Sequence, residues 1–255
     1  MSVSLATDGP VRVIAIDRPH ARNAVDPDTA RALRAAFEAA MADDAVAAIV
    51  LTGTNGAFCA GADLKAVAAG QAFPGIVDGL GPMGPSRALW PKPVIAAVEG
   101  HAVAGGLELA LLADLRIASE TAVFGVFCRR WGVPLIDGGT VLLPRIVGQG
   151  RALDMILTGR AVDAREALAM GLANRVVPAG TARDAAVALA KEIAKFPRTC
   201  MLHDRASAWE QWALPLDAAF ANEARHGAHS LREAAAAGAA RFAAGKGRGG
   251  AFDDI

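Results

Sequence analysis

The sequence has 255 residues, of which 53% are hydrophobic and 20% are charged, and its 26 basic and 26 acidic side chains give a net charge of zero. This apolar composition excludes a disordered chain, and the neutral charge argues against a nucleic-acid partner held by a broad basic surface. No apolar run is long enough to span a membrane, and no N-terminal signal sequence is recognisable. We therefore expect a globular cytoplasmic protein with no membrane partner.

The histidines and cysteines show no metal-binding spacing. Cys59, Cys128 and Cys200 are far apart and contain no Cys-x-x-Cys pair, which fits a reducing compartment. His226 and His229 could share a helix face, but no third ligand is close to them in the sequence. We expect two solvent-facing histidines there rather than a metal site.

Apolar runs and turn residues predict strands mixed with helices first, and then helices alone. The predicted strands lie at residues 11–16, 45–51, 93–98, 115–118 and 122–124. Helices are expected to begin at Asp26 or Asp28, near Asp63 and at Gly105, and to fill most of the chain from about residue 139. This order indicates an α/β core at residues 1–195 and a helical C-terminal region at residues 196–255.

The long loop predicted at residues 70–92 is rich in glycine and proline, and such loops often cover a ligand. Within it, the sequence from Gly79 to Gly84 matches the letters of a dinucleotide-binding loop. It contains Pro82, however, and no acidic residue follows on a strand in the expected place. The chain also lacks a P-loop and a G-x-S-x-G motif, so neither a nucleotidase of that class nor a serine hydrolase is favoured.

Two strand–glycine–helix junctions remain as candidates for chemistry. At each junction a buried strand ends, the chain turns on glycine, and a helix begins with free backbone N–H groups. Two such amides aimed at one oxygen form an oxyanion hole. Glu108 follows Gly105 by three residues and shares a helix face with it. This carboxylate is either a base that moves a proton next to a carbonyl, or a charge that merely stabilises a helix N-terminus.

Several segments resemble the signature segments of the crotonase superfamily, which is the enoyl-CoA hydratase/isomerase family. They are DRPHARNA at 17–24, FCAGADLK at 58–65, PVIAAVEGHAVAGGLELA at 93–110, IDGGT at 136–140 and LTGRA at 157–161. The resemblance implies a spiral of ββα units with a helical C-terminal oligomerisation region. It also implies a homotrimer or a dimer of trimers, an acyl-CoA thioester as partner, and no metal or separate cofactor besides the coenzyme A of the substrate.

The resemblance also assigns the site residues. Ala62 and Gly105 resemble the two oxyanion-hole amides, and Glu108 resembles the residue that moves the proton. The positions expected to contact the coenzyme A thioester are Arg22, Ala24, Ala60, Ala62, Asp63, Leu64, Lys65, Gly105 and Lys246. Lys246 lies in a basic tail that would help a neighbouring subunit hold a phosphate, although a frayed basic end is the alternative.

One departure from the family pattern concerns Cys128, which stands where hydratases have their second glutamate. A thiol is a poor replacement for a carboxylate that holds water. Asp137 is the next acid along the chain, and naphthoate synthases and an aryl-CoA dehalogenase use an aspartate in this region. Alternatively, Asp137 caps the following helix.

The expected function is therefore enoyl-CoA hydration, a lyase reaction of fatty acid metabolism, with Glu108 and Asp137 as candidate acid–base residues. A double-bond isomerase, or another enolate reaction that needs one carboxylate, is the first alternative. A protein that binds coenzyme A thioesters without turnover is the alternative from another class.

Overall fold

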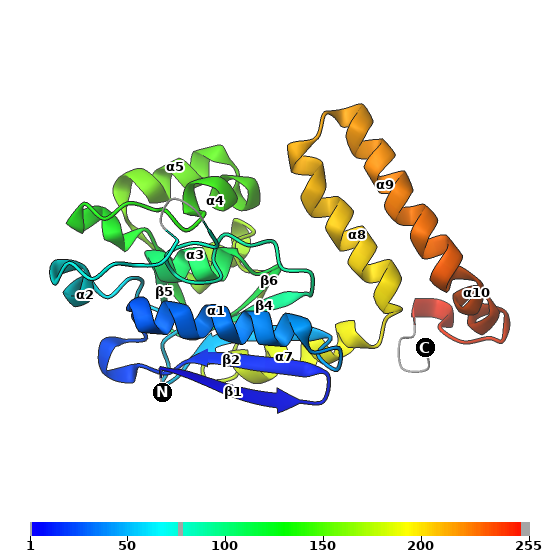
Figure 1. The fold of residues 1–255 in the computed structure, drawn as a ribbon, viewed down its shortest axis with the longest axis horizontal. Coiled ribbons are helices and arrows are strands. Elements are labelled where there is room, and N and C mark those ends of the chain that lie inside the picture. Colours follow the sequence, from blue (N-terminus) through cyan, green and yellow to red (C-terminus); the bar gives the residue numbers. More distant parts are fainter. Residues whose placement is uncertain (1, 76–78, 251–255) are drawn as a thin grey trace. The chain divides into compact units, whose positions relative to one another are not determined.

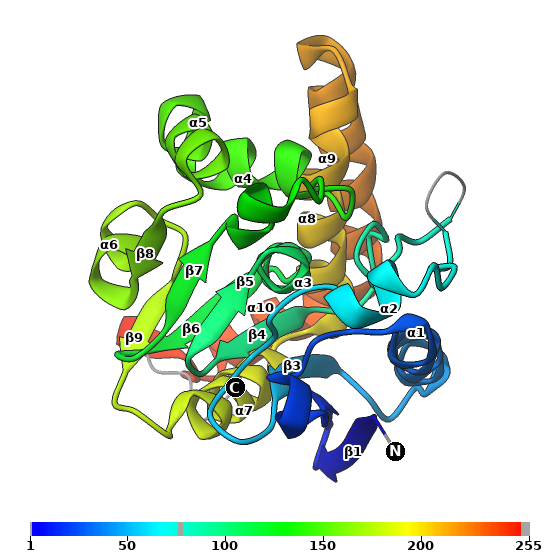
Figure 2. The same ribbon diagram turned by 90° about the vertical axis from the view of Figure 1, so that its left-hand side faces the viewer.

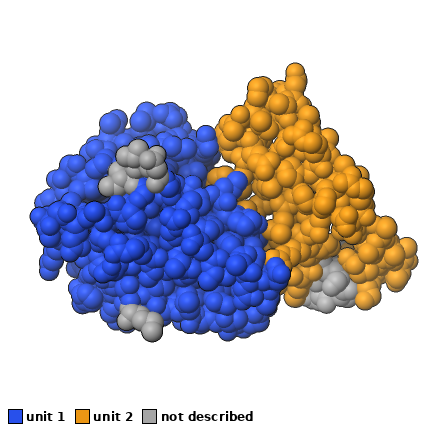
Figure 3. Space-filling model, in the orientation of Figure 1, with its two compact units in different colours: residues 1–190 blue, residues 191–255 orange. Residues whose placement is uncertain are grey.

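The computed structural model describes residues 2–75 and 79–250. The chain divides into two compact units, residues 1–190 and residues 191–255 (Figure 3). The boundary expected from the sequence, after residue 195, lies just past helix α7 (Ala182–Ala194).

A six-stranded sheet lies at the centre of the first unit. In spatial order its strands are β1 (Val3–Asp8), β2 (Val11–Ile16), β3 (Ala48–Gly53), β4 (Val94–Val98), β6 (Leu115–Ser119) and β9 (Arg175–Val177). Only β1 and β2 pair antiparallel, and the other neighbours pair parallel. β4 is buried at every residue, and β2 and β3 at all but one residue each, as expected for parallel strands covered on both faces.

A smaller sheet of β5 (His101–Val103), β7 (Val123–Gly125) and β8 (Ala161–Asp163) lies beside it (Figure 2). β4, β5 and helix α3 (Gly105–Leu111) form one ββα unit. The preceding unit follows the same plan, because an isolated bridge between Cys59 and Ala102 stands between β3 and helix α2 (Leu64–Ala68). The predicted spiral of ββα units is therefore confirmed.

The other helices of this unit agree with the sequence signals. They are α1 (Pro27–Ala42), α4 (Gly139–Val147), α5 (Gln149–Thr158), α6 (Ala164–Ala169) and most of α7, with 3-10 turns at η1 (Pro19–Ala21) and η2 (Phe127–Trp131). Asp26 caps α1, and its carboxylate accepts a hydrogen bond from the Thr29 amide at 2.8 Å. Leu33 and Phe37 lie on the buried face of α1.

The second unit is helical, as predicted. It contains α8 (Arg198–Glu210), η3 (Gln211–Ala213), α9 (Leu216–Ser230), the π-helical turn η4 (Leu231–Ala235), α10 (Ala236–Ala243) and η5 (Arg248–Gly250). α8 and α9 form a hairpin (Figure 1). Among the described side chains of this unit, Asn222 and Ser230 alone are buried.

The histidines of the second unit differ from expectation. His226 and His229 are half-buried, and the Nδ1 atom of His226 lies 2.7 Å from that of His203. The Nε2 atom of His226 lies 3.0 Å from a carboxylate oxygen of Glu210. Even so, the described part of the chain holds no group of three or more His, Cys, Asp or Glu side chains able to hold a metal ion. Nor do the described residues include a helix both long and apolar enough to cross a membrane.

Candidate active site

The two strand–glycine–helix junctions lie side by side. The Cys59 amide donates to the His101 carbonyl at 2.9 Å, and the Val103 amide donates to the Cys59 carbonyl at 3.1 Å. Gly61, with φ of 99°, approaches the second junction so closely that a Cβ atom there would lie 3.0 Å from the Gly105 nitrogen. Pairing with β5 therefore places the first junction against the N-terminus of α3.

The amides of Ala62 and Gly105 are available to a ligand. Both residues line one cavity, and neither amide donates a hydrogen bond within the described residues. Gly105 is the first residue of α3, where N–H groups have no partner inside the helix. Ala104 before it has φ of 55° and ψ of −126°, a conformation that costs about 1–3 kcal/mol. The structure thus brings together the two residues assigned to an oxyanion hole.

Glu108 reaches the same cavity from the first turn of α3, although its side chain is almost wholly buried. Its Oε1 atom accepts hydrogen bonds from the amides of Asp137 and Gly139, both at 2.8 Å. Within the described residues Oε2 has no such partner, and it is not among the buried unpartnered atoms, so it is open to the cavity. Burial, and next the charge of Asp137, raise the pKa of Glu108 to about 8.

Asp137 holds a second buried carboxyl at the cavity. Its Oδ1 atom accepts hydrogen bonds from the Met83 amide at 2.9 Å and from the Ser86 hydroxyl. Burial raises the pKa of Asp137, while these two donors and the charge of Arg87 act in the opposite direction. The alternative in which Asp137 caps α4 is wrong, because the N-cap is Gly138 and the first amide of the helix, that of Gly139, donates to Glu108 instead.

The two buried carboxyls influence each other. Burial and the charge of Asp137 raise the pKa of Glu108 to about 8, so Glu108 keeps its proton at neutral pH. Burial also raises the pKa of Asp137, although its two donors and the charge of Arg87 favour its ionised form. Glu108 is therefore the acid at this cavity, and Asp137 is the candidate base.

The cavity has a volume of about 460 Å³ and a mainly apolar lining. The loop at residues 70–92, which the sequence suggested as a ligand cover, contributes to it, and so does the segment from Phe127 to Trp131. Its apolar side chains include Leu64, Val67, Phe73, Pro82, Met83, Phe127, Trp131, Val133, Pro134 and Ile136. Such a surface suits an uncharged acyl group.

Cys128 also lines the cavity and is buried. Burial raises the pKa of its thiol, and the charge that Glu108 can carry adds to this effect. The thiol therefore stays protonated at neutral pH and supplies no third negative charge.

The residues assigned to coenzyme A have different surroundings. Ala60, Ala62, Leu64 and Gly105 line the cavity. Arg22 and Lys65 are exposed, and Ala24 is buried. Lys246 belongs to the second unit.

Asp63, in contrast, is held by protein groups. It caps α2 by accepting a hydrogen bond from the Lys65 amide at 3.0 Å, and it forms an ion pair with Arg18 at 3.0 Å. Arg18 also forms an ion pair with Asp26 at 2.9 Å and donates to the Ala24 carbonyl. Arg18 therefore joins the segment before α1 to the segment before α2, a role that no local sequence signal reveals.

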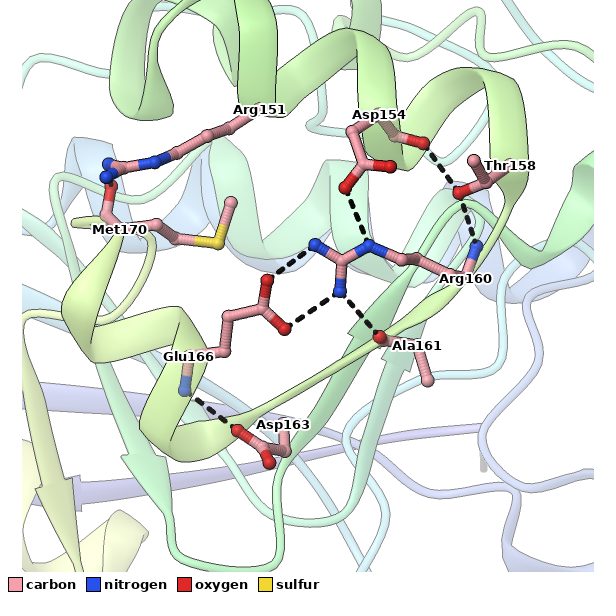
Figure 4. A network of polar contacts seen from close by, with 8 residues as sticks. All are labelled: Arg151, Asp154, Thr158, Arg160, Ala161, Asp163, Glu166 and Met170. Carbon is pink, nitrogen blue, oxygen red and sulfur yellow. Dashed lines mark hydrogen bonds and ion pairs between the residues drawn. The ribbon is translucent and has the colours of Figure 1, made fainter.

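The LTGRA segment at residues 157–161 does not line the cavity. Its arginine, Arg160, donates to Asp154 at 2.6 Å and to Glu166 at 2.8 Å (Figure 4). These contacts connect α5 to α6, and the two carboxylates raise the pKa of the guanidinium. The segment therefore has a structural role in this unit.

Known proteins resemble this chain over most of its length. The sequence model of the family described as enoyl-CoA hydratase/isomerase matches residues 6–243. A probable enoyl-CoA hydratase of Rhizobium meliloti is 45% identical over 191 residues, covering 74% of both chains. Carnitinyl-CoA dehydratase of Proteus mirabilis is 40% identical over 196 residues, which are 76% of this chain and 74% of that protein. The crystal structure of an enoyl-CoA hydratase from Mycobacterium tuberculosis H37Rv is 34% identical, with a TM-score of 0.89 over 95% of each chain. The chain therefore belongs to the enoyl-CoA hydratase/isomerase family.

Proposed function

We propose that this protein is an enoyl-CoA hydratase that adds water to the double bond of a 2-enoyl-CoA. The observation that carries the proposal is the arrangement of two free amides and two buried carboxyls around one apolar cavity. Relatives named as hydratases and dehydratases support it, because both names describe the same reversible reaction.

In the proposed mechanism the thioester oxygen lies between the amides of Ala62 and Gly105. Attack of water at C3 moves an electron pair toward this oxygen, and the two amides stabilise the resulting enolate. Asp137 accepts a proton from the attacking water, and Glu108 donates its proton to C2. The product is a 3-hydroxyacyl-CoA, and one proton then passes from Asp137 to Glu108 to restore the starting state.

Water and the thioester supply every atom of this reaction. The proposed chemistry therefore needs no metal and no cofactor besides the coenzyme A of the substrate. This reaction implies that the protein binds an acyl-CoA thioester. The cytoplasmic location of the protein and its role in fatty acid metabolism remain predictions from the sequence.

A double-bond isomerase is the second candidate, and Cys128 favours it because the thiol replaces one of the two glutamates of the family's hydratases. Isomerisation needs one ionised carboxyl that removes a proton and returns it at another carbon, and a single carboxyl of this cavity is enough for that.

A panel of short, long, branched and aromatic 2-enoyl-CoA thioesters separates these functions. Mass spectrometry detects the gain of water, and chromatography resolves isomers of unchanged mass. We expect water addition to at least one member. Isomers without added water support the second candidate, and binding without any product supports a coenzyme A thioester-binding protein instead.

We also propose a homo-oligomer held by the second unit, with a trimer or a dimer of trimers expected from the family resemblance. Large apolar side chains there are at least half exposed: Trp212, Leu216, Phe220, Leu231 and Phe242. A second copy that covers them removes this apolar surface from water. Light scattering at micromolar concentration tests this, and a monomer there contradicts it.

A further inference from the structure

Part of the long loop, residues 81–87, wraps around Asp137, although none of these residues was assigned to the site from the sequence. The Met83 amide and the Ser86 hydroxyl both donate to Oδ1 of Asp137. The Nε atom of Arg87 donates to the carbonyl of the preceding residue, Ile136, at 2.7 Å. At Gly81, with φ of 102°, a Cβ atom would lie 2.8 Å from the same Oδ1. The loop therefore fits closely against Asp137.

Ser86 is the only side chain of the described residues that donates a hydrogen bond to the Asp137 carboxylate. Its side chain is 1% exposed, so water does not compete for its hydroxyl. A hydroxyl has one proton to donate. The other acceptor within range, the Leu80 carbonyl, lies at 3.5 Å, the far limit of a hydrogen bond. The proton of Ser86 is therefore directed to Asp137.

The two oxygens of Asp137 have different surroundings. Oδ1 accepts both donors, whereas no hydrogen bond of the described residues reaches Oδ2. Oδ2 is also not among the buried unpartnered atoms, and Asp137 lines the cavity. One oxygen is thus anchored in protein while the other is open to the cavity.

We infer that Ser86 is a positioning residue that holds Oδ1 of Asp137, so that Oδ2 faces the cavity and can accept a proton from water. This inference rests on the proposed function for its chemistry. In that reaction Ser86 forms no bond to the substrate and gains or loses no proton. A hydrogen bond to a charged acceptor stabilises the ionised form, so Ser86 also favours the carboxylate of Asp137 over its neutral acid.

The test compares Ser86→Ala with Ser119→Ala. Ser119 is a matched control because it is fully buried, its hydroxyl pairs with that of Thr121 at 2.9 Å, and it does not line the cavity. Removing the Ser86 hydroxyl should raise the pKa of Asp137 by about one unit. The acidic limb of the kcat/KM profile should move to higher pH by the same amount, with KM changed little, while Ser119→Ala leaves the limb in place. Ser86→Thr keeps a hydroxyl and should restore the profile.

A double-mutant cycle and a titration keep the test independent of folding and of the assigned reaction. If Ser86 acts through Asp137, Ser86→Ala should change kcat much less in an Asp137→Asn background than in the wild type. Equal effects in both backgrounds overturn the inference.

Carbon-13 NMR of the Asp137 carboxyl, assigned by its loss in Asp137→Asn, measures the pKa without turnover. An unchanged Asp137 titration in folded Ser86→Ala overturns the inference. A shifted titration in a protein that hydrates no thioester keeps the positioning role of Ser86 and removes the proposed hydratase function.

Discussion

The Glu108 carboxylate accepts a hydrogen bond from the backbone amide of Asp137 at 2.8 Å. The two acids of the cavity are therefore fixed to each other although they lie 29 residues apart in the sequence. The bond by itself favours the ionised form of Glu108, but burial and the charge of Asp137 outweigh it and raise the pKa of Glu108 to about 8.

Glu108→Gln should slow catalysis strongly and preserve binding. The amide oxygen can still accept the hydrogen bonds from Asp137 and Gly139, but the amide N–H groups are not acidic enough to protonate the substrate. We expect kcat to fall by about 10²–10⁴, with the affinity for a coenzyme A thioester changed little. Steady-state hydration and calorimetric titration measure the two quantities. Glu223→Gln, at an exposed position, is the control. A kcat within a factor of two of the wild type would remove Glu108 from the mechanism.

The same substitution should stabilise the fold at high pH. The folded protein raises the pKa of Glu108 from its ordinary 4.5 to about 8. Below the lower value the carboxyl is protonated in both states, so it has no effect on stability. As the pH rises toward 8, the unfolded chain releases a proton that the folded chain retains, and the wild type loses stability.

Glutamine has no such proton. Glu108→Gln should therefore exceed the wild type in free energy of unfolding by on the order of a few kcal/mol at pH 9, and by much less at pH 5. Urea denaturation at both pH values provides the measurement. A difference that is the same at pH 5 and pH 9 would mean that the pKa of Glu108 is not raised by folding.

Elements with a local signal could be predicted from the sequence. Buried runs identified β2, β3 and β4, although β3 begins at Ala48 rather than at residue 45. β1 was missed because it has only two large apolar residues, Val3 and Leu5, and of its six residues only Val3 is buried. β5, β8 and β9 have three residues each, and each includes an ionisable residue, so no continuous apolar run marks them.

In the candidate site, too, some relations between residues can be predicted from the sequence and others cannot. Gly105 and Glu108 belong to one helical turn, so their relation can be read from spacing. The bond from Ser86 to Asp137 joins residues 51 apart, one of them in a loop without periodic pattern. The ion pair of Arg18 with Asp63 spans 45 residues. Contacts of this kind depend on how the spiral closes, and a single sequence carries no signal for them.

Gly106→Ala should disrupt the junction between α3 and the segment before α2. A Cβ atom there would lie 2.9 Å from the Cys59 Cβ and closer still to the Cys59 carbonyl. That carbonyl cannot move freely because it accepts the Val103 amide. We expect a loss of about 1–3 kcal/mol in the free energy of unfolding, and a lower kcat because the neighbouring Gly105 amide shifts.

Gly150→Ala is the matched control, since Gly150 lies in α5 with no atom within 4 Å of the added Cβ. It should stabilise the protein by about 0.5–1 kcal/mol. Thermal denaturation of both variants gives the comparison. Equal stability of the two would contradict the close approach of α3 to Cys59.

The last prediction concerns the source of water activation. If Asp137 is the base, Asp137→Asn should lower kcat by about 10²–10³ with a smaller change in thioester binding. Cys128→Glu should then change hydration of a short enoyl-CoA little, because the base is already present. In the Asp137→Asn background, however, the same Cys128→Glu substitution should restore part of the lost kcat, since it returns a carboxylate to the cavity where the family's hydratases have one.

The rate of water addition, followed by loss of the enoyl absorbance, distinguishes the outcomes. A large gain from Cys128→Glu in an otherwise unchanged chain would mean that the protein lacks a base for water, and it would favour the isomerase. Full hydration by the Asp137→Asn, Cys128→Ala double variant would show that Glu108 suffices. In that case Asp137 would influence Glu108 through its charge alone and would transfer no proton in the reaction.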